Sequence, residues 1–182
     1  MSRVDLDVLL PMVKGHYFEP FFKEVARLEK YTLLLVPYEE DGVRYYAKHA
    51  QEALKIKMQN DYFLLLKCFD GGLLFTNTLY SVYCPDDEDN DLVQRNLYLR
   101  EEGLIPANSF AIGETNYGAY IILRGDGTKP VRIWEPDENG GHVEAEFADL
   151  TEWLMDTVNE AKYLMQDGSL PEIFDPEENE DD

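Results

Sequence analysis

Apolar residues recur at helical spacing near the end of the chain. Between Leu150 and Met165 they follow a three-four repeat, which is the pattern of a helix with one buried face, so a helix is predicted over residues 149–165. Asp149 and Glu152 stand at its start in the arrangement of a capping box. The same spacing predicts three earlier helices, over residues 17–29, 43–56 and 60–69.

Short runs rich in strand-forming residues fill the middle of the chain. Residues 73–83 contain a possible tight turn at Thr76-Asn77-Thr78, and three later runs are separated by the turn-forming sequences ETNYG and RGDGTKP. Strands joined by such short turns must be antiparallel, because parallel neighbours need a long crossover. The runs are residues 109–113, 119–123 and 131–135, with an alternating edge candidate at 142–147 and a strand or extended connector at 31–36.

These elements predict an α+β fold with N-terminal helices, an antiparallel sheet of about four to six short strands, and a closing C-terminal helix packed on the sheet. The length of 182 residues suits one domain with a sizeable core and is marginal for two. Residues 1–39 are expected to form a helical extension packed on the core, and residues 40–165 the α+β domain. Residues 166–182 carry acidic and no basic side chains, and we expect them to form a flexible tail.

The chain carries a formal net charge of −21, from 37 acidic and 16 basic side chains. This charge repels nucleic acid phosphates and anionic lipid headgroups and favours encounters with basic surfaces, although solubility alone also explains it. The sequence contains no run of about 20 apolar residues, and residues 1–15 lack the features of a signal peptide. Two cysteines cannot form a disulfide framework for a chain of this size. We therefore expect a cytoplasmic protein that binds neither nucleic acid nor membranes.

No arrangement typical of a catalytic or metal site stands out in the sequence. His16, His49 and His142 are scattered, and no metal-binding motif occurs. Cys68 lies in an apolar helical segment, and the acidic residues after Cys84 should raise the pKa of its thiol and make it a poor nucleophile. No catalytic residue, metal or cofactor is expected, and a hydrolase that uses a pair of carboxylates is the less favoured alternative.

The pair Gly71-Gly72 lies between a predicted helix and a predicted strand. Phosphate-binding glycines stand in the opposite order, between a strand and a helix N-terminus, so a ligand-binding role is not expected. We interpret the pair as the end of the helix, where a left-handed residue caps its carbonyl groups, and as the corner into the strand at Leu73. Replacing either glycine with valine is predicted to lower stability.

An acidic loop precedes a short helix expected at about residues 91–101. Its sequence, CPDDEDND, indicates either a solvated surface or a negative patch that steers and holds a basic partner. Exposed aromatic residues would strengthen the second interpretation, since tyrosine and tryptophan supply many interface hot spots, although Trp134 is equally consistent with a place in the core. The candidate partner-binding residues are Asp86, Asp87, Glu88, Asp89, Asp91, Glu114, Tyr117 and Trp134.

Four segments stand in an order and spacing that can be compared with known families. The first is an apolar helix that ends in Gly-Gly, and the second passes from one strand through a glycine-containing turn into another. The third is a strand that ends in Trp-Glu, and the last leads into the closing helix. They are ALKIKMQNDYFLLLKCFDGG (53–72), FAIGETNYGAYIIL (110–123), VRIWE (131–135) and AEFADLTEWL (145–154).

In this order the segments resemble the SUKH superfamily, in particular its cell-wall-assembly-regulator-like branch, over roughly residues 40–160. Gln59, Asp70 and Glu135 depart from the usual proline, asparagine and aspartate of that branch. The resemblance implies a non-enzymatic interaction domain without catalytic residues. Many bacterial members are similar to immunity proteins that neutralise toxins, often nucleases, and fungal relatives are regulatory scaffolds. We expect a monomer or weak homodimer that binds a basic toxin domain, or alternatively a scaffold for a cellular protein.

Overall fold

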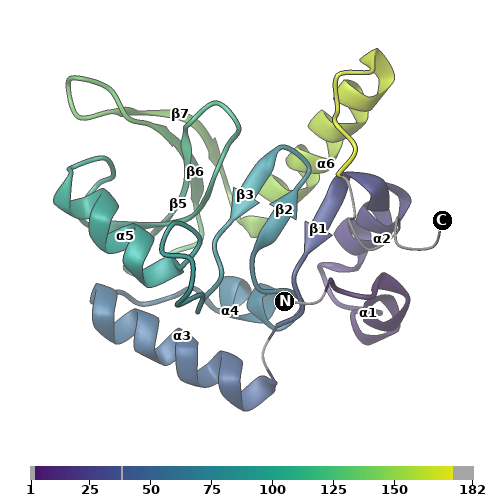
Figure 1. Cartoon of the computed structure of the whole chain (residues 1–182), viewed down its shortest axis with the longest axis horizontal. Coiled ribbons are helices and arrows are strands. Elements are labelled where there is room, and N and C mark those ends of the chain that lie inside the picture. The colour runs from purple at the N-terminus through teal and green to yellow at the C-terminus, as the bar shows by residue number, and fades with distance from the viewer. Residues whose placement is uncertain (1–2, 38, 174–182) are drawn as a thin grey trace.

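The computed structural model describes residues 3–37 and 39–173, and within them it confirms the α+β class (Figure 1). The strands are β1 (Thr32–Leu34), β2 (Gly72–Leu74), β3 (Asn77–Leu79), β4 (Ser109–Glu114), β5 (Tyr120–Arg124), β6 (Val131–Glu135) and β7 (His142–Phe147). They form one antiparallel sheet in the order β1-β2-β3-β4-β5-β6-β7, so each strand pairs with its neighbours in the chain. The short turns between β4 and β7 can only link antiparallel neighbours, as the sequence predicts.

The sheet has seven strands where the sequence predicts about four to six. The additional strand is β1, which the sequence leaves open as a strand or a connector and which pairs with β2 from Thr32 opposite Leu74 to Leu34 opposite Gly72. β1 lies within the segment 1–39 that we expected to be a helical extension. The sheet therefore draws one strand from that segment.

Helices lie around the sheet. The helix at Leu6–Met12 is not among the ranges predicted from the sequence, and the bounds of the others follow the predicted segments with small shifts. They are α1 (Leu6–Met12), α2 (Glu19–Arg27), α3 (Glu40–Leu54), α4 (Asn60–Leu66), α5 (Leu92–Glu101) and α6 (Leu150–Asp167), with a 3₁₀ turn at Glu29–Tyr31. The start of α6 resembles the predicted capping box: the side chain of Asp149 accepts from the backbone N–H of Glu152 at 3.0 Å, and the carboxylate of Glu152 accepts from the N–H of Ala148, the residue before the N-cap, at 2.6 Å.

The core lies between the sheet and these helices. α2 packs on α6, whereas α3 and α5 run side by side in another part of the molecule (Figure 1). Phe18, Phe21 and Phe22 at the start of α2 have no exposed surface. Nearly every residue of β4 and β5 is buried, and because successive side chains of a strand point to opposite faces, both faces of the sheet are covered at its centre.

The glycine pair after α4 has a different role from the predicted one. α4 ends at Leu66, before the predicted end at residue 69, and the backbone N–H of Lys67 caps it without a glycine. Gly71 and Gly72 do have positive φ angles of 78° and 112°. A Cβ atom at Gly72 would overlap the carbonyl oxygen of Leu33, so the residue is glycine because β1 lies against it.

The part of the predicted tail that the structure describes packs on the helices. Gly168, directly after α6, has the left-handed conformation and caps the helix, and Leu170 is buried. The backbone N–H of Ile173 donates to the carbonyl oxygen of Lys30 at 2.8 Å. Residues 174–182, the rest of the predicted tail, lie outside the described residues.

Candidate functional site

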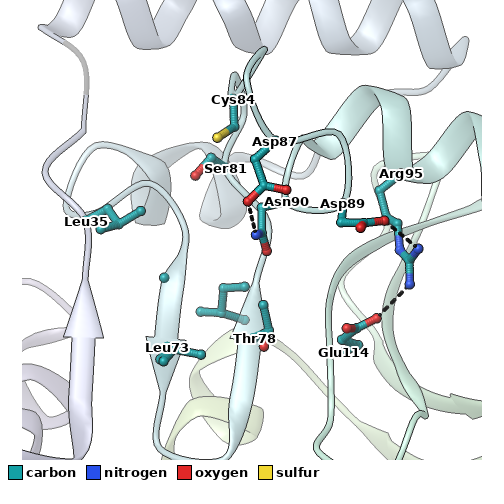
Figure 2. A pocket seen from close by; sticks show the side chains of 12 residues that line it. Leu35, Leu73, Thr78, Ser81, Cys84, Asp87, Asp89, Asn90, Arg95 and Glu114 are labelled. Atoms are coloured by element: carbon teal, nitrogen blue, oxygen red, sulfur yellow. Dashed lines mark hydrogen bonds and ion pairs between the residues drawn. The ribbon is translucent and has the colours of Figure 1, made fainter. Parts of the chain in front are cut away.

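A groove opens where β3 separates from β4. Thr78 and Leu79 pair with Glu114 and Gly113, and after Tyr80 the chain leaves the sheet and continues toward α5. The groove has a volume of about 640 Å³ (Figure 2). Its lining comes from the residue after β1, from β2, β3 and β4, from the loop before α5 and from α5 itself: Leu35, Gly72, Leu73, Thr78, Leu79, Ser81, Cys84, Asp87, Asp89, Asn90, Arg95 and Glu114.

α5 is fixed against β4 by a buried asparagine. The side-chain amide of Asn96 donates to the carbonyl oxygen of Ala111 at 2.7 Å, and its oxygen accepts from the Ala111 N–H at 2.6 Å. These bonds replace those that a longer β3 would have made, so β4 keeps its backbone groups satisfied beyond the end of β3. Arg100 adds a second link through the carbonyl oxygen of Ser109 at 2.7 Å.

Asp91 forms the start of α5. One of its carboxylate oxygens accepts from the N–H groups of Val93 and Gln94 at 3.0 and 2.9 Å, which is the bonding of a helix N-cap. The other oxygen accepts from the N–H of Cys84 at 2.8 Å and so closes the acidic loop. Asp91 is only 5% exposed, and both of its oxygens are occupied by the protein's own backbone.

Asp86, Asp87, Glu88 and Asp89 are all exposed, in contrast to Asp91. Asp87 accepts from the side-chain amide of Asn90 at 2.6 Å, which orders the loop. Asp89 lies 3.3 Å from a guanidinium nitrogen of Arg95 at the rim of the groove. Four successive carboxylates therefore face solvent beside the groove.

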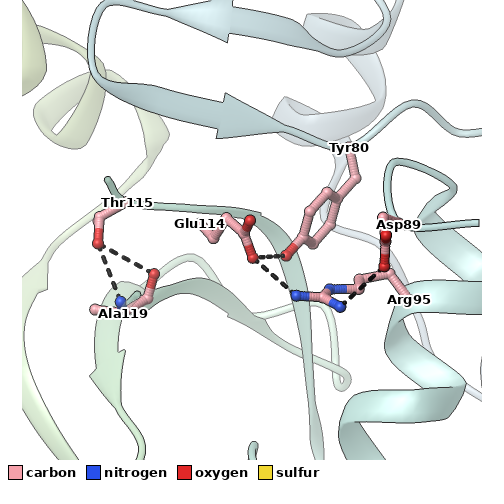
Figure 3. Close-up of polar contacts among 6 residues, drawn as sticks. All are labelled: Tyr80, Asp89, Arg95, Glu114, Thr115 and Ala119. Atoms are coloured by element: carbon pink, nitrogen blue, oxygen red, sulfur yellow. Dashed lines mark hydrogen bonds and ion pairs between the residues drawn. The ribbon is translucent and has the colours of Figure 1, made fainter. Parts of the chain in front are cut away.

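Arg95, Glu114 and Tyr80 form a hydrogen-bonded group between α5 and the sheet (Figure 3). Oε2 of Glu114 accepts from Arg95 at 3.0 Å and from the hydroxyl of Tyr80 at 3.0 Å. Burial raises the pKa of Tyr80, which keeps its hydroxyl protonated as a donor. Because Arg95 contacts both Asp89 and Glu114, its positive charge is neutralised within the groove.

Asp70 holds the segment after β3, of which Ser81 lines the groove. Asp70 is 1% exposed, and its Oδ1 accepts from the N–H of Val82 at 2.6 Å while its carbonyl oxygen accepts from the hydroxyl of Ser81 at 3.0 Å. Oδ2 is buried without a hydrogen-bond partner among the described residues. Burial raises the pKa of Asp70 to about 7, the bond from Val82 opposes the rise, and the charge of Asp91 adds to it.

Comparison with protein families identifies the fold that carries this groove. A family model described as SUKH_5, SMI1-KNR4 cell-wall, matches residues 30–159. The chain belongs to this SUKH family. No curated protein matches it in sequence. The matched range includes β1 and the whole groove, and it leaves α1 and α2 outside.

The SUKH domain brings only some of the predicted binding residues together. Asp87, Asp89 and Glu114 line the groove, with Asp86 and Glu88 in the same exposed loop. Tyr117 is 60% exposed but lines a different hollow, of about 220 Å³ beside α6, where its hydroxyl donates to Glu144 at 3.0 Å. Trp134 is half-buried, and its indole N–H donates to the carbonyl oxygen of Leu104 at 3.0 Å, which gives it a structural contact.

Arg95 and Tyr80 are site residues that sequence reasoning missed. Arg95 is the one basic residue in the stretch 84–99. A single cation close after four successive acidic residues could have indicated from the sequence that it pairs with one of them. Tyr80 carried no such signal, because its contact with Glu114 joins residues 34 positions apart.

Among its described residues, the groove offers no activated nucleophile. The hydroxyl of Ser81 is committed to the carbonyl oxygen of Asp70. Partial burial and the neighbouring carboxylates raise the pKa of the Cys84 thiol, as the sequence predicts, and burial raises that of Cys68 to about 11. Over residues 3–37 and 39–173 no three His, Cys, Asp or Glu side chains are grouped to hold a metal ion. In the same residues, no helix has the length and apolar character to cross a membrane.

Proposed function

We propose that this chain is a non-enzymatic protein-binding module of the immunity type, which neutralises a basic toxin domain by binding it directly. The observation that carries the proposal is the row of four exposed carboxylates, Asp86 to Asp89, at the rim of the groove. The charged groups among the described residues that line the groove are Asp87, Asp89 and Glu114 against Arg95, three acids to one base. This arginine is already paired, so the surface attracts further positive charge.

The bonding of the groove supports a binding role over hydrolysis. Asp87 accepts from Asn90, and Glu114 accepts from both Arg95 and Tyr80. A general acid or base must be free to exchange a proton with a substrate, whereas one oxygen of each of these two carboxylates is already engaged by donors of the protein itself. These contacts leave a fixed negative surface, which steers a basic partner and sets its orientation.

The proposal predicts that association depends on the loop and on salt. Replacing Asp86, Asp87 and Asp89 with asparagine and Glu88 with glutamine should slow association with the partner roughly tenfold at low ionic strength. The difference should shrink as salt rises above about 0.15 M, because the screening length is then about 8 Å. The partner is first captured from the native source and identified by mass spectrometry, and rates are then measured by surface plasmon resonance.

A charge-matched control separates the loop from the overall charge. Glu52, Glu138, Asp156 and Glu172 are exposed and lie outside the groove, so neutralising them removes the same charge. This control should change the association rate less than about twofold. Equal slowing by both variants would contradict a role for the loop. Capture of a cellular protein that is not a toxin would instead favour the regulatory scaffold.

A further inference from the structure

α5 carries apolar side chains on two opposite faces. The inner face packs on the sheet, and the outer face carries two adjacent apolar residues between polar ones. The inner residues are Leu92, Val93, Asn96 and Leu99. The outer residues are Gln94, Leu97, Tyr98 and Glu101, all exposed.

Leu97 and Tyr98 form an apolar pair in the middle of this outer face. They are 45% and 49% exposed. Both line a shallow hollow of about 510 Å³, whose other lining residues are Glu88, Asp89, Gln94, Arg95 and Glu101. A leucine and a tyrosine side by side in a hollow are the kind of side chains that anchor interfaces, because they bury much apolar surface on binding.

Arg95 joins this hollow to the groove. Its guanidinium group lies 5.7 Å from the centre of the Tyr98 ring, while the same group bonds Glu114 in the groove. Arg95 and Asp89 line both hollows. The groove, the acidic loop and the outer face of α5 are therefore parts of one surface, with a fixed arginine between them.

We infer that the outer face of α5 anchors the partner, and that it takes a basic segment with a large apolar side chain between lysine or arginine residues. The inference rests on the proposed function and defines the partner's chemistry. Leu97 and Tyr98 offer the apolar contact, and Glu88, Asp89 and Glu101 around them match basic side chains. The arginine in the hollow adds no net repulsion, since Asp89 and Glu114 pair with it.

The two halves of the surface act on different steps of binding. The loop carboxylates act at a distance and raise the rate of encounter. The Leu97–Tyr98 pair acts only in contact, where burying its apolar surface against the partner slows dissociation. Changes in the pair should therefore alter the affinity for apolar segments and leave purely electrostatic binding unchanged.

Two synthetic peptides of equal length and charge test the inference by fluorescence anisotropy with the full chain. One places leucine between lysines at helical spacing, and the other has serine in place of leucine. The double variant Leu97→Ser, Tyr98→Ser should bind the lysine–leucine peptide about tenfold more weakly than the native chain does. Its affinity for the lysine–serine peptide should stay within about twofold.

A matched control removes an apolar and an aromatic side chain from other helices. Met12 and Tyr163 are also exposed, and the variant Met12→Ser, Tyr163→Ser should bind both peptides as the native chain does. Unchanged binding of the lysine–leucine peptide by the Leu97/Tyr98 variant, or equal loss in the control, would overturn the inference. If the circular dichroism shows that the double variant is not folded, the single variant Leu97→Ser is used instead. Its affinity for the lysine–leucine peptide should be about threefold lower than that of the native chain.

The loop variant described above separates this inference from the proposed function. Neutralising residues 86–89 should weaken both peptides, since both carry the same charge. If the loop variant binds both peptides normally while the Leu97/Tyr98 variant loses only the lysine–leucine peptide, the acidic loop is excluded as the steering element. The apolar anchoring by Leu97 and Tyr98 would then be upheld, and the matching of basic side chains by Glu88 and Asp89 would be excluded.

Discussion

At the scale of single residues, Gly72 allows β1 and β2 to lie side by side. Its φ of 112° is unfavourable for other residues, and a Cβ atom there would overlap the backbone of Leu33. Because a backbone carbonyl cannot swing aside as a side chain can, Gly72→Ala should lower the free energy of unfolding by roughly 3 kcal/mol. Urea denaturation measures this.

Gly118 provides the control for that substitution. Its φ is 90°, but no atom of the described residues would lie within 4 Å of an added methyl group. Gly118→Ala should therefore cost only about 1 kcal/mol, from backbone strain. Equal losses in the two variants would mean that strain alone, rather than the contact with β1, determines the need for glycine at position 72.

Asp70 makes stability depend on pH in an unusual direction. The unfolded chain releases its proton near pH 3.8, whereas burial holds the folded pKa at about 7. Between these values the folded state binds more protons, so the contribution of Asp70 to stability is present at low pH and is lost as the pH rises toward 7. This is opposite to the usual behaviour of a salt-bridged aspartate.

Asp70→Asn isolates this contribution, because asparagine stays neutral and keeps an oxygen for the Val82 N–H. The difference in unfolding free energy, variant minus native, should rise from pH 4 to pH 7 by roughly 3 kcal/mol and level off above pH 8. Denaturant titrations at each pH measure the difference. Parallel stability curves for the two proteins would show that Asp70 ionises normally in the folded state.

At the scale of elements, the acidic loop divides into a structural and an exposed part. Asp91 caps α5 and holds the N–H of Cys84, so Asp91→Ala should destabilise the protein by about 2 kcal/mol. Asp86 is exposed, and Asp86→Ala should change stability by less than about 0.5 kcal/mol. Thermal and urea unfolding of the two variants, Asp91→Ala and Asp86→Ala, measures these changes. A large loss of unfolding free energy in the Asp86 variant would show that the exposed loop has a structural role.

The sequence predicts the bounds of an element well where local signals, such as apolar spacing and capping residues, determine them. The spacing and capping box of α6 predict the helix to within two residues at its C-terminal end, since both signals are local. The end of α4 was placed too late, because residues 67–69 continue its apolar pattern while the chain already turns toward β2. Apolar residues on both faces of α5 gave no information about which face was buried.

At the scale of the whole molecule, α2 belongs to the core although the family match begins at residue 30. Phe22 has no exposed surface and packs edge-on against Phe69, with ring centres 6.1 Å apart. Phe22→Ala should therefore cost about 3–5 kcal/mol, as large cavities in a core do. Calorimetry should show a large fall in Tm, whereas Met12→Ala, at an exposed position of α1, should leave Tm within about 2 °C. If the Phe22 variant unfolds at the native Tm, α2 does not contribute to the stability of the core, and the prediction is wrong.

The candidate site needed the tertiary structure because its contacts cross long stretches of chain. Composition and spacing predicted the acidic loop at 86–89, and that loop is exposed. They grouped Asp91 with residues 86–89 as an acidic side chain of one loop, whereas in the structure Asp91 is buried as the N-cap of α5. Tyr117 and Trp134 were grouped with the loop by residue type, and the sheet places them in other contacts.

The sequence by itself determined the α+β class, the antiparallel order of the strands and the strong negative charge. Hydrophobic periodicity, turn residues and counted charges are properties of short segments, and no distant contact is needed to read them. Only the tertiary structure decided that β3 leaves β4 early, that Asn96 completes the edge of β4, and that Leu97 and Tyr98 face solvent beside the acidic groove. These features depend on how helices and strands pack against one another. Packing brings together residues that are far apart in the chain, and no local sequence pattern indicates such contacts.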